Sequence, residues 1–520
     1  MMRFRVWAPR ARRADLQLRG EPLAMRAAGG GWWEADAEAA AGAGYGFRLD
    51  GGDPLPDPRS RWQPDGVHGL SRLVDHGAFR WTDAGWTPPR LADCVLYELH
   101  VGTFTPGGTF WSAIERLDDL VALGVTAVEL MPVAEFSGER GWGYDGVDLW
   151  APHHAYGGPD GLKALVDACH RRGLAVVLDV VYNHLGPEGN YLERFGPYVT
   201  RRHRTPWGGA VNFDGRDGRP VRDFVVENAL AWLRDYHVDG LRLDAVHAIV
   251  DTSRPHILEE LARRVHEVEP RRFVVAEKPR LDPELMAAGL DGQWADDLHH
   301  SLHVLLTGER AGYYAPYGAV GDLAAALRQP GRLGVDAARV VGFAQNHDQV
   351  GNRAIGERLS QLVDRGRLRQ AAALVLCSPF VPMLFMGEEW GASTPFLFFS
   401  DHRDPAVGRA TSRGRMREFE TFGWRPEDVP DPQRRSSFER SRLDWSERVR
   451  EPHAGLLRWH RDLLRLRAGS PELRAGAPLR VTHGERSRTL TMTRGEVRVR
   501  SDFRTGIVSV DTHGRSLDGE

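Results

Sequence analysis

Cysteine is scarce in this sequence, which has three among its 520 residues. Cys94, Cys169 and Cys377 lie far apart, in apolar surroundings, and are odd in number. Buried free thiols are therefore expected, because a disulfide framework or a cysteine metal site needs paired and closely spaced cysteines. The low count argues against a fold that depends on disulfides.

Long apolar runs and an excess of one charge are also missing. The longest apolar run, Ala371 to Met386, contains Pro379 and Pro382, so it predicts a buried helix and strand rather than a membrane span. A formal net charge of -3 provides no basic surface for nucleic acid or anionic lipid, and neither is an expected partner. The amino-terminal residues MMRFRVWAPR lack the apolar core of a secretory signal, which predicts a cytoplasmic location.

The chain does have enough apolar material for a large core, with 42% hydrophobic residues. Its length exceeds that of a usual single core, which predicts one large domain with appendages or three domains. The sequence also has 16 tryptophans, and flat apolar faces of this kind are what sugar rings prefer to lie against.

The two ends of the chain have the alternating pattern of β-strands. FRVWAP, ADLQL and YGFRLD predict an N-terminal immunoglobulin-like β-sandwich, similar to a carbohydrate-binding module, over residues 1–89. The turn-rich stretch up to Pro89 predicts the domain boundary. RSRTLTMTRGEVRVRS predicts a small C-terminal β domain that follows a linker helix within residues 456–520.

Between these ends, apolar strand-like runs alternate with amphipathic helical runs, which is typical of βα units around a parallel sheet. At least seven units favour a closed (β/α)8 TIM barrel over residues 90–455, with a loop subdomain near residues 185–214. The predicted fold class is therefore α/β. The strand runs are CVLYELHV, VTAVELMPV, LAVVLDVVYNH, VDGLRLDAV, RRFVVAEK, VVGFAQNHD and PFVPMLFMGEEW.

Polar residues recur where these strands end, and in a barrel the carboxyl ends of the strands build the active site. A single polar strand end is commonly a turn or cap residue, but four together favour a functional site. The third strand ends in Asp179, Asn183 and His184, the fourth in Arg242, Asp244 and His247, and the fifth in Glu277. The run VVGFAQNHD, taken as the seventh strand of the barrel, ends in His347 and Asp348.

Two of these carboxylates have settings that suit glycoside hydrolysis. Arg242 and Asp244 are two apart on one strand and share a face, so the guanidinium is expected to keep the carboxylate ionised; an ordinary ion pair is the alternative. Glu277 follows the apolar VVA, where burial is expected to raise its pKa; a buried Glu paired with Lys278 or Arg242 is the alternative. A nucleophile about 5 Å from a general acid is the arrangement of retaining glycosidases.

The motifs DVVYNH, GLRLDAVH, AEK and NHD resemble, in this order, four motif regions of the α-amylase superfamily of glycoside hydrolases. The resemblance implies that Asp244 is the nucleophile, that Glu277 is the general acid/base, and that Asp348 stabilises the transition state. It also implies sugar-positioning roles for Arg242, His184 and His347. Tyr144 in WGYDGVD looks like the aromatic platform under that sugar, with a packed loop aromatic as the alternative.

The chain is similar over almost its whole length to the malto-oligosyltrehalose trehalohydrolase family, including QWADDLHHSLHVLLTGERAGYY, FAQNHDQVGNR and LFMGEEWGASTPFLFFSDH. This resemblance implies hydrolysis of the α-1,4 bond next to the terminal trehalose of maltooligosyl trehalose, and functional pairing with a synthase that makes this substrate. KPRLDP after Glu277 departs from the family pattern. The predicted substrate contacts are Tyr144, Asp179, Asn183, His184, Arg242, His247, Asp296, Asp297, His347, Gln349 and Asn352.

No cofactor or metal is expected. Asp296, Asp297, His299 and His300 could suggest a metal site, but hydrogen bonding to sugar or within their loop is the preferred interpretation. Two other functions stay open. A glycogen branching or debranching enzyme would share the barrel and the three carboxylates, and a non-catalytic glucan-binding protein would share the fold.

Overall fold

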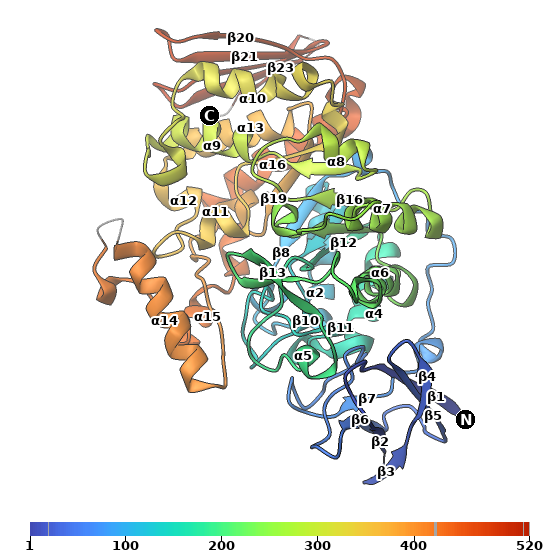
Figure 1. The fold of residues 1–520 in the computed structure, drawn as a ribbon. Helices are drawn as coiled ribbons and strands as arrows, with labels where there is room; N and C mark the ends of the chain where they lie inside the picture. The colour runs from blue at the N-terminus through green and yellow to red at the C-terminus, as the bar shows by residue number, and fades with distance from the viewer. Residues whose placement is uncertain (19, 421–423, 513, 519–520) are drawn as a thin grey trace.

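A closed barrel of eight parallel strands forms the centre of the computed structural model (Figure 1), which describes residues 1–18, 20–420, 424–512 and 514–518. Neighbouring strands follow one another in sequence, and the last strand pairs with the first, which confirms the predicted barrel. In chain order the strands are β8 (Leu96–Leu99), β9 (Ala127–Leu130), β12 (Ala175–Val180), β15 (Gly240–Leu243), β16 (Phe273–Ala276), β17 (Gly292–Trp294), β18 (Val340–Phe343) and β19 (Val381–Phe385).

Seven of these strands coincide with the predicted runs, because a parallel strand buried on both faces is almost continuously apolar. The strand β17 has no such run. It has only three residues, and one of them is the polar Gln293. Pairing with β16 and β18 holds it in the sheet, so tertiary context rather than local pattern defines this strand.

Helices cover the outside of the barrel. After the first barrel strand the chain forms the short helices α2 (Phe110–Ile114) and α3 (Leu117–Leu123). The long apolar run forms α13 (Arg365–Leu376) and β19, as predicted. Among the described residues, no helix is both long enough and apolar enough to span a membrane. Other covering helices are α4 (Gly158–His170), α6 (Gly218–Asp235), α7 (Ile257–Val268), α9 (Asp296–Thr307), α10 (Val320–Leu333) and α16 (His453–Gly469).

Two small sheets form the N-terminal domain, at the bottom of Figure 1. Phe4 of one sheet packs edge-on against Tyr45 of the other, with ring centroids 5.2 Å apart. Trp7 packs in the same way on Tyr198, at 5.3 Å, and so joins this domain to the loop region after β12. The sheets are β1 (Met2–Trp7), β5 (Trp32–Ala37) and β4 (Arg26–Gly29), and β3 (Glu21–Ala24), β2 (Ala14–Leu18), β6 (Gly44–Leu49) and β7 (Ser71–Arg72).

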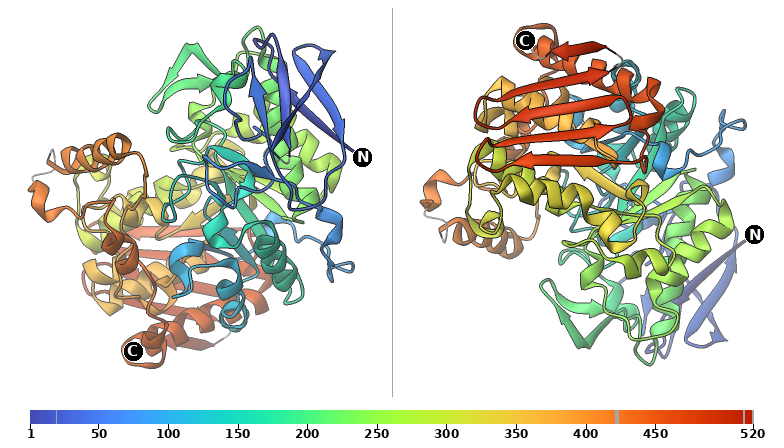
Figure 2. Two further views of the ribbon diagram at one scale, coloured as in Figure 1. Left: turned by 90° about the horizontal axis from the view of Figure 1, so that it is seen from below. Right: turned by 90° about the horizontal axis from the view of Figure 1, so that it is seen from above.

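The C-terminal domain is one antiparallel sheet, seen face-on in the right-hand view of Figure 2. Its apolar face packs on α10 and α13. The fully buried Arg494 side chain attaches the sheet to the barrel, because it donates to the carbonyl oxygen of Ser378 at 2.5 Å. The strands are β20 (Arg480–Gly484), β21 (Thr489–Arg494), β22 (Val497–Asp502), β23 (Ile507–Thr512) and β24 (Arg515–Asp518).

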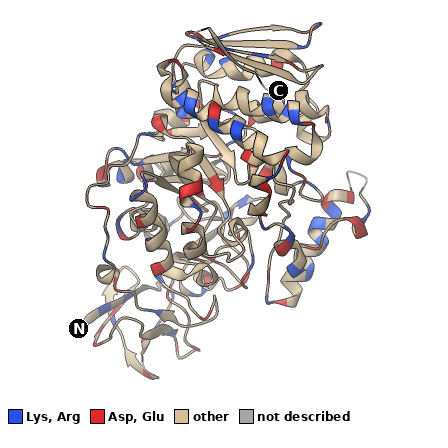
Figure 3. Ribbon diagram, turned by 180° about the vertical axis from the view of Figure 1, so that it is seen from behind, with Lys and Arg blue, Asp and Glu red and all other residues tan. Residues whose placement is uncertain are grey.

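Two further segments extend from the barrel. The loop after β12 contains α5 (Leu192–Phe195) and the hairpin of β13 (Val199–Thr205) and β14 (Gly208–Val211). After β19, α14 (Pro405–Glu420) and α15 (Arg435–Arg440) form an arm that projects to one side in Figure 1. Acidic and basic residues are interspersed on this arm and along the barrel helices in the view of Figure 3.

Candidate active site

Arg242 lies at the centre of a cluster of carboxylates at the carboxyl ends of the barrel strands. Its side chain is 0% exposed and contacts Asp179 at 2.7 Å, Asp244 at 3.0 Å and Glu277 at 3.0 Å. The two-residue spacing predicted that Arg242 and Asp244 share a face, and their contact confirms it. One buried cation therefore holds three carboxylates from β12, β15 and β16 in place.

Asp244 is held from both sides. Arg242 binds its Oδ1, and the side-chain amide of Asn183 donates to its Oδ2 at 2.6 Å. The next residue, Ala245, has a left-handed backbone with φ 39°, which costs a non-glycine residue on the order of 1 kcal/mol. This turn directs the amide N–H of Ala245 at Oε2 of Glu277, 2.6 Å away. Backbone strain is thus coupled to the positioning of the second carboxylate.

Glu277 has the environment of a carboxylic acid rather than a carboxylate. Burial raises its pKa to about 8, with further increases from Asp244 and Asp348, while Arg242 opposes the shift. The Ala245 amide donates to Oε2, and Arg242 Nη2 forms its ion pair with the same oxygen. The proton therefore resides on Oε1, which neither group contacts.

A second group of side chains faces this pair from β18 and from the loop after β9. His347 and Asp348 begin α11 (His347–Gly351). Asn346 caps the amino terminus of this helix, because its side-chain oxygen accepts from the Gln349 amide at 2.9 Å. The hydroxyl of Tyr144 donates to Asp179 at 2.6 Å and lies 2.8 Å from His347 Nε2. The Tyr144 ring stacks on His347, with centroids 5.1 Å apart.

The glycine before Tyr144 is required for this placement. Gly143 has φ 96°, and a Cβ atom there would lie 2.1 Å from the carbonyl oxygen of Pro132. Only glycine lets the loop approach the end of β9 so closely. The WGYDG motif therefore contains a glycine that the close approach of the chain requires, as well as the aromatic side chain of Tyr144.

The remaining predicted contacts surround this centre at different depths. His184 is buried, hydrogen-bonds Asn183 and stacks on Trp207 at 4.7 Å, whereas His247 is exposed. Asn352 donates to Asp348 at 3.1 Å. Gln349 accepts from Tyr313 at 3.3 Å. Burial, with a contribution from Asp348, raises the pKa of Asp296 to about 7.

Asp296 and Asp297 were expected to lie in a loop. They instead form the first turn of α9. Asp297 accepts from Tyr317 at 2.6 Å and from Gln329 at 2.9 Å. These partners belong to the protein itself, and Asp297 borders a separate cavity of about 240 Å³ between α9 and α10. We therefore leave Asp297 out of the proposed substrate contacts.

The segment KPRLDP after Glu277 is organised by its own residues. Lys278 forms an ion pair with Asp282, four residues later. The Gln293 side chain donates to the carbonyl oxygens of Lys278 at 3.0 Å and Arg280 at 2.7 Å. Lys278 thus has a local partner, and Arg242 is the cation that contacts Glu277.

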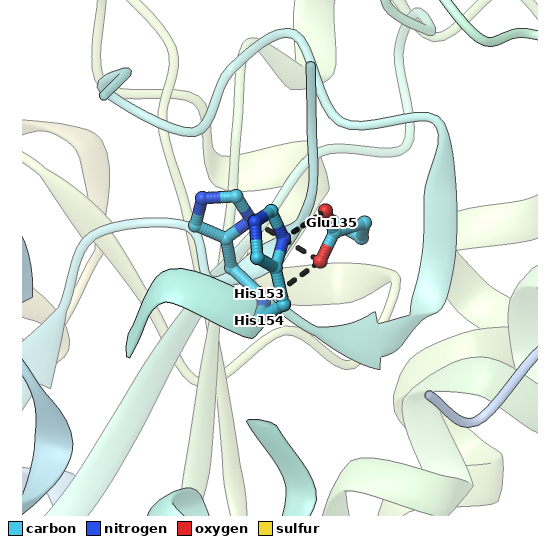
Figure 4. A group of neighbouring side chains, drawn as sticks. All are labelled: Glu135, His153 and His154. Atoms are coloured by element: carbon cyan, nitrogen blue, oxygen red, sulfur yellow. Dashed lines mark hydrogen bonds and ion pairs between the residues drawn. The ribbon is translucent and has the colours of Figure 1, made fainter. Parts of the chain in front are cut away.

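Among the described residues, one group of three His, Cys, Asp or Glu side chains brings its ligand atoms within 4.8 Å of one another. It consists of Glu135, His153 and His154 (Figure 4). Glu135 ends β10 (Ala134–Glu135), His153 follows β11 (Asp148–Pro152), and His154 begins η3 (His154–Tyr156). Burial acts to raise the pKa of Glu135, but the two histidines outweigh it and lower the pKa. Glu135 also accepts from the His154 amide at 2.8 Å, so we interpret the group as a structural network and assign no metal to it.

His299 is likewise occupied by the protein. Its Nδ1 bonds the carbonyl oxygen of Ala344 at 2.7 Å, and its Nε2 bonds the hydroxyl of Tyr314 at 2.9 Å. Both nitrogens therefore have partners other than a metal. The three cysteines are buried and free, as the sequence predicted.

A cavity of about 410 Å³ lies beside the carboxylate cluster, and the sequence did not predict it. Asn352 borders it and also donates to Asp348, so the cavity adjoins the carboxylates. Tyr313, Tyr314 and Trp424 provide aromatic walls. The adjacent tyrosines in the sequence were the only local sign of an aromatic site. Trp424 comes from the arm after β19, and only the fold brings it next to them.

Comparison with known proteins identifies the family. Residues 76–205 match the α-amylase catalytic domain. The malto-oligosyltrehalose trehalohydrolase of Arthrobacter ramosus is 49% identical over 98% of this chain and 94% of its own length. The chain belongs to the malto-oligosyltrehalose trehalohydrolase family. Members of this family are glycoside hydrolases of the α-amylase superfamily, as the motifs at the strand ends predicted.

The structural comparison agrees with the trehalohydrolase family fold. A Salmonella typhimurium protein provisionally named an α-amylase is 40% identical, has a TM-score of 0.88, and is matched over 96% of this chain and 90% of its own. The 1,4-α-glucan branching enzyme of Corynebacterium jeikeium is only 29% identical, over 75% of this chain and 60% of its own length. The comparisons therefore favour the trehalohydrolase family over the branching enzymes.

Proposed function

We propose that this chain hydrolyses the α-1,4-glucosidic bond next to the terminal trehalose of maltooligosyl trehalose, with retention of configuration. The products are trehalose and a shorter maltooligosaccharide. One observation carries the mechanism: Arg242 binds both Asp244 and Glu277 at 3.0 Å, and Glu277 has a pKa raised to about 8. The choice of substrate is supported by the names of the relatives, which are trehalohydrolases.

In the first step, Asp244 attacks the anomeric carbon while Glu277 gives its proton to the oxygen that leaves with trehalose. Arg242 and Asn183 bind the two oxygens of Asp244 and aim its carboxylate. The proton on Glu277 is available at neutral pH because burial keeps this side chain neutral. The bond between the anomeric carbon and the leaving oxygen breaks, and a glycosyl ester of Asp244 forms.

In the second step, Glu277 is ionised after its proton has left, and it removes a proton from water. The resulting hydroxide attacks the anomeric carbon and releases Asp244. Asp348, with Asn352 bonded to it at 3.1 Å, is proposed to bind sugar hydroxyls and stabilise the positive charge on the ring. Tyr144, stacked on His347, is proposed to lie under that ring.

We propose that the cavity beside Asp348 receives the leaving trehalose. Its volume of about 410 Å³ lies within the range of small-molecule sites, and Tyr313, Tyr314 and Trp424 offer flat apolar faces to sugar rings. Glu309, Arg353 and Glu357 add charged groups for hydroxyl contacts. An aromatic cavity on one side of the carboxylates would favour a compact disaccharide over an extended glucan chain.

Trp424→Ala is expected to raise KM for maltotriosyl trehalose about fivefold and to change kcat little, because one aromatic contact contributes roughly 1 kcal/mol. Steady-state kinetics on this substrate would measure it. Trp111→Ala is the matched control, since Trp111 is 52% exposed on α2 and is expected to leave KM unchanged. An unchanged KM in Trp424→Ala would remove this cavity from the substrate path.

The decisive test of the function is product analysis. The purified protein is incubated separately with maltotriosyl trehalose, maltopentaose and glycogen, and the products are identified by chromatography. Trehalose and maltotriose from the first substrate, with little action on the others, is the expected result. New or cleaved α-1,6 linkages would instead identify a branching or debranching enzyme, and inactivity on all three would support a glucan-binding protein.

A synthase is the proposed functional partner. Maltooligosyl trehalose carries an α,α-1,1 linkage at what was the reducing end of a glucan, so another enzyme must rearrange that end before this hydrolase acts. Coupled incubation of maltopentaose with such a synthase and this protein should release trehalose, whereas either enzyme alone should not. The cytoplasmic location stays a prediction.

A further inference from the structure

Glu98 is a buried carboxylate below the catalytic cluster to which no role has been assigned. It lies on β8, is 1% exposed, and both of its oxygens contact His347. Oε2 accepts the backbone N–H of His347 at 2.9 Å, and Oε1 lies 2.5 Å from the ring nitrogen Nδ1. One carboxylate thus binds both the backbone and the ring of a residue 249 positions away.

The hydrogen bonds around His347 define its protonation. Nδ1 faces a carboxylate oxygen, which can only accept, so Nδ1 carries a hydrogen. Nε2 lies 2.8 Å from the hydroxyl oxygen of Tyr144, whose single proton is donated to Asp179 at 2.6 Å. That oxygen can therefore only accept from Nε2, so Nε2 carries a hydrogen too.

We propose that Glu98 is a positioning residue for the reaction, because it holds His347 as an imidazolium whose Nε2–H faces Tyr144 and the carboxylate of Asp348. His347 Nε2 lies 3.5 Å from Asp348 Oδ1. The cation is therefore next to the carboxylate proposed to stabilise the transition state, and its ring supports Tyr144. The activity measurements below depend on the proposed function, whereas the protonation of His347 does not.

The neighbouring strand explains how Glu98 can hold the negative charge. Glu129 of β9 is the cross-strand partner of Glu98, is 1% exposed, and has no hydrogen-bond partner on either oxygen. Burial, with repulsion from Glu98 and Asp179, raises the pKa of Glu129 well above its usual value. Glu129 has no N–H donor to stabilise a negative charge, whereas Glu98 receives two N–H donors from His347.

Charged and titratable groups from several elements of the barrel face His347. Burial acts to lower the pKa of His347, but Asp348 and Glu98 outweigh it and raise the pKa to about 9. The positive Arg242 opposes this increase. The groups facing His347 are Glu98 on β8, Glu129 on β9, His100 after β8, Tyr144 on the loop, Asp179 on β12, Arg242 on β15 and Asp348 on α11.

Glu98→Gln is the first test. A glutamine has one acceptor oxygen and one NH2 donor, so it can satisfy only one of the two N–H groups of His347. The imidazolium is expected to lose its proton at a lower pH. We expect kcat/KM for maltotriosyl trehalose to fall about 100-fold at pH 7.5, and the alkaline limit of activity to move from about pH 8 to below pH 7.

Glu129→Gln is the matched control, because it changes the neighbouring buried carboxylate, which is already neutral and unbonded. It is expected to keep the wild-type pH profile and a kcat/KM within about threefold of wild type. Glu98→Asp is the second variant. It retains the charge but is too short to reach both N–H groups, so kcat should fall while the alkaline limit stays near that of wild type.

The wild-type protein provides a test that does not depend on variants or on turnover. With 15N-labelled histidine, and with His347→Gln to assign the signal, both ring nitrogens of His347 should be protonated at pH 7.5 and should titrate near pH 9. A neutral His347 at pH 7.5 would overturn the proposal. An unchanged pH profile in a folded Glu98→Gln protein would overturn it as well, whichever substrate the enzyme prefers.

Discussion

Asp244→Ala is expected to lower kcat for maltotriosyl trehalose by on the order of 10⁴-fold or more. The variant has no carboxylate to form the glycosyl ester, and the remaining carboxylates are committed to other partners: Asp179 to Arg242 and Tyr144, and Glu277 to Arg242 and Ala245. Turnover is measured by the release of trehalose. The fold should persist, because Asn183 and Arg242 become accessible to water at the opening of the barrel.

Rescue with azide distinguishes a lost nucleophile from a damaged site. A small anion can enter the space left by the Asp244 carboxylate and attack the anomeric carbon from the same side. The expected product is a glycosyl azide of inverted configuration, detected by NMR. Asp462→Ala on the outer face of α16, where Asp462 pairs with Arg465, is the control and should retain full activity. A wild-type kcat in the Asp244→Ala protein would refute the role of Asp244 as the nucleophile.

Glu277→Gln is expected to lower kcat for maltotriosyl trehalose by about 10³-fold to 10⁴-fold. The amide oxygen can still accept from Ala245 and contact Arg242, so the geometry should be kept, but the side chain has no proton acidic enough to give to the leaving oxygen. A substrate with a leaving group that needs no proton separates the two steps. With α-maltosyl fluoride, Glu277→Gln should release fluoride in an initial burst and then stall before hydrolysis.

The pH dependence follows from the same side chain. Burial raises the pKa of Glu277 to about 8, and the protonated form is the one that acts as the acid. Activity should therefore be retained below pH 8 and lost as the pH rises through about 8, in a plot of kcat/KM against pH. The residual activity of Glu277→Gln should lack this limit. Glu284→Gln, at an exposed position on α8 (Pro283–Ala287), should preserve both the activity and the limit.

Much of the barrel could be predicted because its signals are local. Seven strands were recognisable as apolar runs, and four of them ended in polar residues at the edge of the sheet that carries the site. The three-residue strand β17 carries no such pattern and depends on its neighbours. The aspartates before His299 resembled a loop motif, yet they begin α9, where carboxylates in the first turn favour the helix.

The sequence placed most of the candidate site residues at the ends of barrel strands, but it did not predict most of their side-chain contacts. The spacing of Arg242 and Asp244 implied their contact, since side chains two apart on a strand share a face. The pairing of Glu277 with Arg242 was only one alternative beside Lys278, and nothing local indicated that Asp297 would turn toward Tyr317. These contacts depend on how neighbouring strands and helices are rotated relative to one another.

The sequence by itself determined the fold class, the strand ends that carry chemistry, and the family, because strand alternation and motif spacing are properties of short segments. Only the tertiary structure decided that Glu98 meets His347, and that Trp424 joins Tyr313 beside Asp348. Closure of the barrel pairs β19 with β8 and brings together residues hundreds of positions apart. Side chains at such separations share no local pattern, so their contacts, and the protonation that follows from those contacts, are set by the packed barrel.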